Sequence, residues 1–187
     1  MEAKRLLRSR LVAARAARPA AEIADDGRAL AEHAARAWSS TTRLAAYAAT
    51  GTEPPTRPMI DRLRASGVEV LLPVVADAEL RWAPYDGWDR LVPGRFGLLQ
   101  PAGPLLPVGV LGEVDVIAAP ALAVDVHGHR LGRGGGYFDR ALTAVDRAVI
   151  VAVVFDDEVL DEVPVEPHDR AVTGVLTPSG LRRLTDE

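Results

Sequence analysis

Short apolar runs bounded by turn residues, several of them rich in Val and Ile, constrain the fold of this chain more than any other feature. They cover residues 43–49, 68–73, 115–120 and 148–155, and helical stretches lie between them. Runs of this length are typical of buried strands. Because strands that alternate with helices usually pair in parallel, the pattern predicts an α/β fold with a largely parallel central sheet and helices on both faces. The functional site is then expected in the loops at the strand ends.

Length and composition favour one globular unit. The chain has 187 residues, of which 48% are apolar and 26% charged, so we expect a single domain over residues 1–187 with a Rossmann-like three-layer arrangement. Cysteine is absent, which excludes disulfides, thiolate metal sites and cysteine nucleophiles.

The formal net charge of −4 argues against nucleic acid or an anionic membrane as a partner. No apolar run approaches the roughly 20 residues of a membrane span, and we expect a cytoplasmic monomer.

The amino-terminal segment predicts an amphipathic helix over residues 2–18 that stops at Pro19, because Ala, Leu and Arg are strong helix formers. At helical spacing its apolar stripe comprises Leu7, Leu11 and Ala14. An adjoining cationic stripe comprises Lys4, Arg8 and Arg15. Such a stripe is most often a solvated face of a helix, but it also offers fixed positive charge to an anionic ligand.

Two loops and a second helix complete the outline. A helix is predicted over residues 20–38, and the loop TGTEPPT follows the first apolar run. Thr56 is expected to cap the next helix, with Pro58 in its first turn. The Gly and Pro density of residues 84–112 favours loops and short strands, and we expect this segment to line the functional site.

The segment DVHGHRLGRGGGYFDR, residues 125–140, carries the most chemistry. Its glycines allow tight turns and close approach to a ligand, their amides could form an anion-binding nest, and the helix that begins near Gly136 would point its positive end at the same place. Arg130 and Arg133 offer forked donors for phosphate or carboxylate oxygens, and Asp139 could hold Mg²⁺ that bridges phosphates. Neither the dinucleotide fingerprint nor the P-loop is present. The alternative is a solvent-exposed glycine turn without a ligand.

The string PALAVDVHGHRLGRGGGYFDRAL, from Pro120 to Leu142, resembles the signature of the 5-formyltetrahydrofolate cyclo-ligase family, whose members are also called methenyltetrahydrofolate synthetases. KRLLR, GTEPPT, GLLQP and VEPHDRAVTGVLTP extend the resemblance over nearly the whole chain, in the family's order. The resemblance implies conversion of 5-formyltetrahydrofolate to 5,10-methenyltetrahydrofolate at the expense of ATP, with Mg²⁺ and with release of ADP and phosphate. The expected partners are therefore small molecules, a reduced folate and ATP.

The resemblance also implies site residues. Those matching the ATP site are Lys4, Arg5, Leu6, Leu7 and Arg8, together with Arg130, Leu131, Gly132, Arg133, Gly134, Gly135, Gly136, Tyr137 and Phe138. Those matching the folate site are Glu53, Arg133, Gly134, Gly135, Gly136 and Tyr137. Asp139 and Asp169 match the magnesium ligands, and Arg133 and Tyr137 are the expected catalytic residues.

The folate loop departs from the family pattern. Many members carry an acidic residue just before the threonine of this loop, where this chain has Pro55, which leaves Glu53 as the nearer carboxylate. Glu53 could accept hydrogen bonds from the pterin's amino and ring N–H groups, or be an ordinary surface glutamate. A flat wall for the pterin could come from the aromatic residues Trp82, Tyr85, Trp88 and Phe96.

The implied reaction needs no nucleophilic side chain. The formyl oxygen would attack the γ-phosphate, and ring closure by the second folate nitrogen would then expel phosphate, so the protein supplies alignment and charge neutralisation. Two other functions remain open: a phosphosugar-binding enzyme on a similar scaffold, and a folate- or nucleotide-binding module without catalysis. Nucleic-acid binding is the least favoured, because one short cationic stripe on an acidic protein is a weak signal.

Overall fold

The computed structural model describes residues 2–77, 79–143, 145–166 and 169–184. Its main sheet has seven strands in the order β12-β11-β9-β6-β1-β2-β3. The parallel strands are β1 (Arg43–Ala45), β2 (Glu69–Ala76), β6 (Val116–Pro120), β9 (Val149–Val153) and β11 (Gly174–Thr177). Both edge strands, β3 (Glu79–Pro84) and β12 (Gly180–Arg183), pair antiparallel. The predicted α/β fold with a largely parallel sheet is confirmed.

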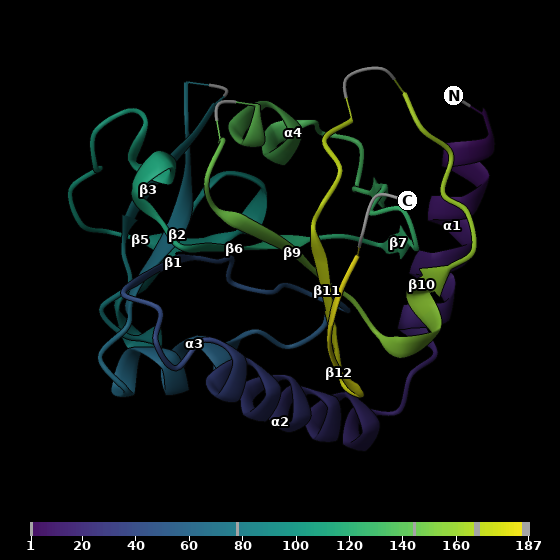
Figure 1. Ribbon diagram of the computed structural model, residues 1–187, viewed down its shortest axis with the longest axis horizontal. Coiled ribbons are helices and arrows are strands. Elements are labelled where there is room, and N and C mark those ends of the chain that lie inside the picture. Colours follow the sequence, from purple (N-terminus) through teal and green to yellow (C-terminus); the bar gives the residue numbers. More distant parts are fainter. Residues whose placement is uncertain (1, 78, 144, 167–168, 185–187) are drawn as a thin grey trace.

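Helices cover both faces of this sheet (Figure 1). The helices α2 (Ala20–Ala37) and α3 (Arg57–Ala65) pack on one face, and α4 (Tyr137–Leu142) lies on the other with the 3-10 turn Val110–Glu113. Alternation along β2 divides the core, because Val70 and Leu72 belong to the cluster under α2 and α3 whereas Leu71 belongs to the cluster under α4. The expected three-layer arrangement is therefore present.

Helix α1 (Glu2–Ala16) packs beside the main sheet, against a small second sheet (Figure 1). That sheet has the order β10-β7-β8, from β10 (Val159–Leu160), β7 (Ala123–Asp125) and β8 (Arg130–Leu131). Leu11 is buried there with Leu122 and Leu131, and Leu7 packs against the same cluster. The strand β8 of this sheet leads directly into the glycine-rich loop, so α1 is held next to that loop.

The predicted stripes of α1 need correction. Ala14 is exposed, whereas Lys4 and Arg15 are buried and Arg8 is half-buried. The cationic stripe is therefore not a solvated face, because each of its members points into the protein. Arg15 lies 2.6 Å from Glu158 Oε1 and donates to the carbonyl of Ala121 at 2.7 Å. These partners bind two of the three guanidinium nitrogens and hold the group inside the protein.

The first apolar run forms a shorter strand than predicted. Only Arg43–Ala45 pair as β1, and the chain then leaves the sheet toward the cavity described below. Thr56 does not cap α3 through its side chain. Its hydroxyl instead donates to the carbonyl of Tyr47 at 2.6 Å and accepts from the amide of Ala49 at 3.0 Å. Thr56 thus fixes the strand-end loop rather than the helix.

Residues 84–112 form turns and short strands, as expected. They include the hairpin of β4 (Leu91–Pro93) and β5 (Leu99–Pro101) and three single 3-10 turns. No helix among the described residues is long and apolar enough to cross a membrane.

Candidate functional site

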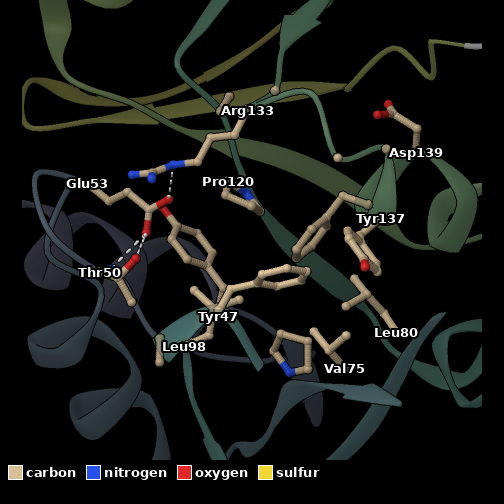
Figure 2. Close-up of a pocket in the computed structure, with 18 of the residues that line it drawn as sticks. Tyr47, Thr50, Glu53, Val75, Leu80, Leu98, Pro120, Arg133, Tyr137 and Asp139 are labelled. Atoms are coloured by element: carbon tan, nitrogen blue, oxygen red, sulfur yellow. Dashed lines mark hydrogen bonds and ion pairs between the residues drawn. The ribbon is translucent and has the colours of Figure 1, made fainter. Parts of the chain in front are cut away.

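A cavity of about 450 Å³ opens at the carboxyl ends of β1 and β6 (Figure 2). Its walls come from the loop after β1, the hairpin segment 96–100, the end of β6 and the glycine-rich loop with the start of α4. Carboxyl ends of parallel strands meet at one edge of a sheet, which is why segments distant in the sequence converge there. The expected position of the site at the strand ends is therefore occupied by a cavity.

The glycine-rich loop needs its glycines for backbone geometry. Gly134 and Gly136 have φ of +99° and +65°. Residues that carry a side chain rarely adopt this backbone conformation. The chain turns there from β8 into α4, and Gly132, Arg133, Gly134, Gly135, Gly136, Tyr137 and Phe138 all line the cavity. This loop is a wall of a cavity and not merely a solvent-exposed turn.

Arg133 and Glu53 face each other at the cavity wall (Figure 2). Arg133 Nε lies 3.1 Å from Glu53 Oε1, while Glu53 Oε2 accepts from the amide of Thr50 at 2.8 Å. The Glu53 side chain is 10% exposed and that of Arg133 is 55% exposed. The carboxylate is therefore held in place by its own loop, whereas the guanidinium group stays accessible to a ligand.

Pro55 lies outside the cavity lining. A Cβ added at Gly27 of α2 would lie only 3.0 Å from the Cβ of Pro55, so the loop is pressed against α2 at this point. Glu53 is thus the carboxylate that the loop presents to the cavity.

The amino-terminal helix α1 contacts the glycine-rich loop from outside the cavity. Arg8 Nε donates to the carbonyl of Gly132 at 2.8 Å, and Lys4 Nζ lies 2.6 Å from Asp169 Oδ2 and 3.1 Å from Glu166 Oε2. Arg5 and Leu6 are exposed on the outer side of α1. Seven of the residues predicted for the site do not line the main cavity: Lys4, Arg5, Leu6, Leu7, Arg8, Leu131 and Asp169. Arg8 therefore contacts the glycine-rich loop and Lys4 contacts Asp169 and Glu166, but neither side chain lines this cavity.

Arg130 connects the two predicted metal ligands. Its guanidinium group is buried and donates to Asp139 and to the carbonyl of Arg170. Burial lowers the pKa of Arg130, and the negative charges of Asp139 and Asp169 act in the opposite direction. Both carboxylates thus lie within the electrostatic reach of one arginine.

Asp139 and Asp169 could supply only some of the ligands that a metal ion needs. Among the described residues, no group of three or more His, Cys, Asp and Glu side chains could hold a metal ion. Asp139 Oδ1 accepts from Arg130, and Asp169 Oδ2 accepts from Lys4. Because Mg²⁺ usually keeps waters and binds one or two carboxylates beside substrate phosphates, this donor set fits a magnesium ion that arrives with a nucleotide.

The four aromatic residues proposed from the sequence divide into different roles. Trp82 and Tyr85 are buried in the core, and Trp88 packs against it. Phe96 lines the cavity, with its ring centroid 6.2 Å from that of Tyr137. Of the four, Phe96 therefore lines the cavity, together with Tyr137 and Phe138, and its ring meets that of Tyr137 edge to face rather than forming one flat wall.

Sequence reasoning missed Tyr47, Thr50 and Leu98, which also line the cavity (Figure 2). A signal for the first two was present, because both follow β1, and residues just after a parallel strand lie at the functional edge of the sheet. Leu98 lies between two short strands, inside the GLLQP motif and the segment 84–112 that was expected to line the site, but it was not named as a site residue.

Comparison of the sequence with known proteins identifies one family. The model of the 5-formyltetrahydrofolate cyclo-ligase family matches residues 1–178. A 5-formyltetrahydrofolate cyclo-ligase of Mycolicibacterium smegmatis is 46% identical over 157 residues, covering 78% of this chain and 80% of its own. One from Escherichia coli K12 is 33% identical over 129 residues, covering 66% and 71%.

The fold has a solved relative. The NMR structure of Aquifex aeolicus 5,10-methenyltetrahydrofolate synthetase superposes with a TM-score of 0.80 at 27% identity, covering 98% of this chain and 94% of that one. A synthetase of Mycoplasma pneumoniae shares the fold, with a TM-score of 0.72 at 16% identity and coverage of 92% and 97%.

Proposed function

Because the chain belongs to the 5-formyltetrahydrofolate cyclo-ligase family, we propose that it converts 5-formyltetrahydrofolate to 5,10-methenyltetrahydrofolate with consumption of ATP and Mg²⁺ and release of ADP and phosphate. The observation that carries this proposal is the cavity itself. One wall is the glycine-rich loop with Arg133 and Tyr137, and the facing wall presents the carboxylate of Glu53. Such a site offers an anion-binding side and a side that accepts hydrogen bonds from a heterocycle.

The reaction requires activation of a poor leaving group. In the proposed first step the formyl oxygen attacks the γ-phosphorus, the new O–P bond forms, and the bond from that phosphorus to ADP breaks. The second folate nitrogen then attacks the activated carbon and loses its proton. The C–O bond breaks, and phosphate leaves with the former formyl oxygen. The protein must mainly align the reactants and neutralise charge.

We propose that Arg133 neutralises the charge of the transferred phosphoryl group. Its guanidinium group is accessible and borders both the glycine-rich loop and Glu53. We assign it to the junction of the two substrates together with Tyr137, and the backbone of residues 130–138 to the triphosphate. Lys4 and Arg8 add positive charge behind this loop, and the proposed contact of residues 4–8 with ATP rests on the family resemblance.

Mg²⁺ enters this scheme with ATP. Asp139 lines the cavity, and both Asp139 and Asp169 act on the charge of Arg130, so these two residues are the proposed magnesium ligands. The ion supplies charge neutralisation at the phosphates when it is bound. Arg130 holds the carboxylate of Asp139 in place through its buried guanidinium group.

We further propose that residues 1–187 act as one domain, as a cytoplasmic monomer without a nucleic-acid or membrane partner. The net charge of −4 supports the absence of bulk attraction to either polyanion.

The test is the near-ultraviolet absorbance of the purified protein with 5-formyltetrahydrofolate, ATP and Mg²⁺, because the methenyl product has a more extended chromophore than the substrate. Absorbance should grow only when all three are present, with one ADP released per product. ATP binding with a flat absorbance trace would instead favour a binding module. Retention of a phosphosugar without ATP turnover would favour the other enzyme class.

A further inference from the structure

The hydroxyl of Tyr47 is buried and has no hydrogen-bond partner among the described residues. The residue is 5% exposed. One nitrogen of Arg15 and one of Arg18 are also buried without a partner, but these two guanidinium groups donate through their other nitrogens. Of these three residues, only Tyr47 has a side chain that makes no hydrogen bond. A buried hydroxyl without a partner destabilises the folded state, so its presence calls for a physical reason.

The position of Tyr47 supplies that reason. It follows β1 and lines the main cavity, and its ring extends toward Glu53 (Figure 2). The backbone at Tyr47 is held in this place by the hydroxyl of Thr56, which donates to the carbonyl of Tyr47. Burial and the charge of Glu53 raise the pKa of Tyr47, so the phenol stays neutral and keeps its proton to donate.

Glu53 alone has little capacity left for a ligand. A carboxylate offers about four acceptor positions. Oε1 faces Arg133, and Oε2 accepts from the amide of Thr50 at 2.8 Å and faces its hydroxyl at 3.4 Å. A heterocycle that presents donors and a carbonyl side by side along one edge therefore needs a second polar group next to Glu53.

We infer that Tyr47 is a specificity-determining residue whose hydroxyl hydrogen-bonds the polar edge of the bound pterin beside Glu53. The pterin edge carries an amino group, a ring N–H and a carbonyl oxygen in succession. Glu53 accepts from one donor of this edge through its remaining acceptor position, and the Tyr47 hydroxyl donates to the carbonyl oxygen. The inference rests on the proposed function, since it assumes that the cavity takes a reduced folate.

The test compares Tyr47→Phe with Tyr85→Phe, which removes the same atom at another buried tyrosine. The Tyr85 hydroxyl donates to Asp61 and does not line the cavity. Tyr47→Phe should leave the unfolding temperature unchanged or raise it, because an unpaired hydroxyl is removed. It should weaken 5-formyltetrahydrofolate binding, measured by calorimetry without ATP, about tenfold. The KM for this folate should rise similarly while kcat stays within about twofold.

Tyr85→Phe should show the opposite pattern, with a lower unfolding temperature and an unchanged folate Kd. The inference is overturned if Tyr47→Phe binds the folate as the wild type does, or if it loses stability in the manner of Tyr85→Phe. Failure of the folded wild-type protein to bind 5-formyltetrahydrofolate would overturn the proposed function, and with it the inference. The wild-type measurement thus separates the two failures.

Discussion

Lys4 Nζ lies 2.6 Å from Oδ2 of Asp169, although 165 positions separate the two residues in the chain. Glu166 adds a second carboxylate at 3.1 Å. The Lys4 and Asp169 side chains are 6% and 13% exposed, so the pair is shielded from water and from salt. This pair joins the first turn of α1 to the segment that precedes β11.

Breaking this pair should destabilise the fold. Lys4→Met and Asp169→Asn should each lower the free energy of unfolding by about 2–3 kcal/mol, because each removes one charge of a pair that is shielded from water. The double variant should lose less than the sum of the two. Urea denaturation of the four proteins measures the coupling, and strictly additive losses would show that the pair contributes nothing.

Arg133→Ala should damage turnover far more than stability. We expect kcat/KM to fall at least about a hundredfold, the typical loss when a group that stabilises transition-state charge is removed. The unfolding temperature should change little, because the side chain is 55% exposed. Arg147→Ala is the control, since Arg147 is exposed and lies outside the cavity. Equal loss of stability and activity would indicate that Arg133 is structural.

Asp139→Asn should shift the magnesium dependence. The Mg²⁺ concentration for half-maximal activity should rise about tenfold or more, because a neutral amide is a weaker ligand than a carboxylate. Stability should also fall, since buried Arg130 loses its charged partner. Asp146→Asn, at an exposed position, should change neither property. An unaltered magnesium titration would remove Asp139 from the metal site.

Acid stability should depend on Asp125. Its buried carboxylate accepts from the amides of His127, His129 and Val163 and pairs with His129 Nδ1 at 3.0 Å. Burial raises the pKa of Asp125, but these hydrogen bonds outweigh it and hold the pKa below its usual value. Since the folded-state pKa is lowered, the stabilisation is present above about pH 4 and is lost as pH falls through the folded-state value.

Asp125→Asn should therefore lower the free energy of unfolding at pH 7 by about 2–3 kcal/mol, because several hydrogen bonds lose their charged acceptor. The difference from the wild type should shrink below pH 4. Chemical denaturation at a series of pH values measures both effects. A difference that is constant from pH 7 to pH 3 would contradict this account.

The pair of Arg15 and Glu158 offers a test of a fully buried charge. Arg15 Nη2 lies 2.7 Å from Glu158 Oε2, and both side chains are almost completely inaccessible. Arg15→Met should cost about 3–5 kcal/mol, because Glu158 is left buried without a counter-charge. Arg15→Met combined with Glu158→Leu should recover much of that loss in denaturation experiments. A double variant as unstable as the worse single one would show that the pair is irreplaceable.

Local features of the chain were sufficient for much of this fold. Apolar runs predicted β2, β6 and β9, and helix-forming segments predicted α1 and α2 to within a few residues. The motifs around the glycine-rich loop predicted the family, which the comparisons confirm. These predictions succeed because propensity and periodicity depend on residues that are neighbours in the chain.

Tertiary structure decided which polar groups meet. Lys4 and Arg15 look like members of a solvated stripe in the sequence, yet they are buried because their acidic partners come from segments beyond residue 155. Thr56 looks like a helix cap but binds the loop after β1. Tyr47 looks like one more apolar residue of a strand, and only the convergence of distant loops makes it a wall of the cavity. Burial and partnership depend on contacts across the chain, and no local pattern encodes them.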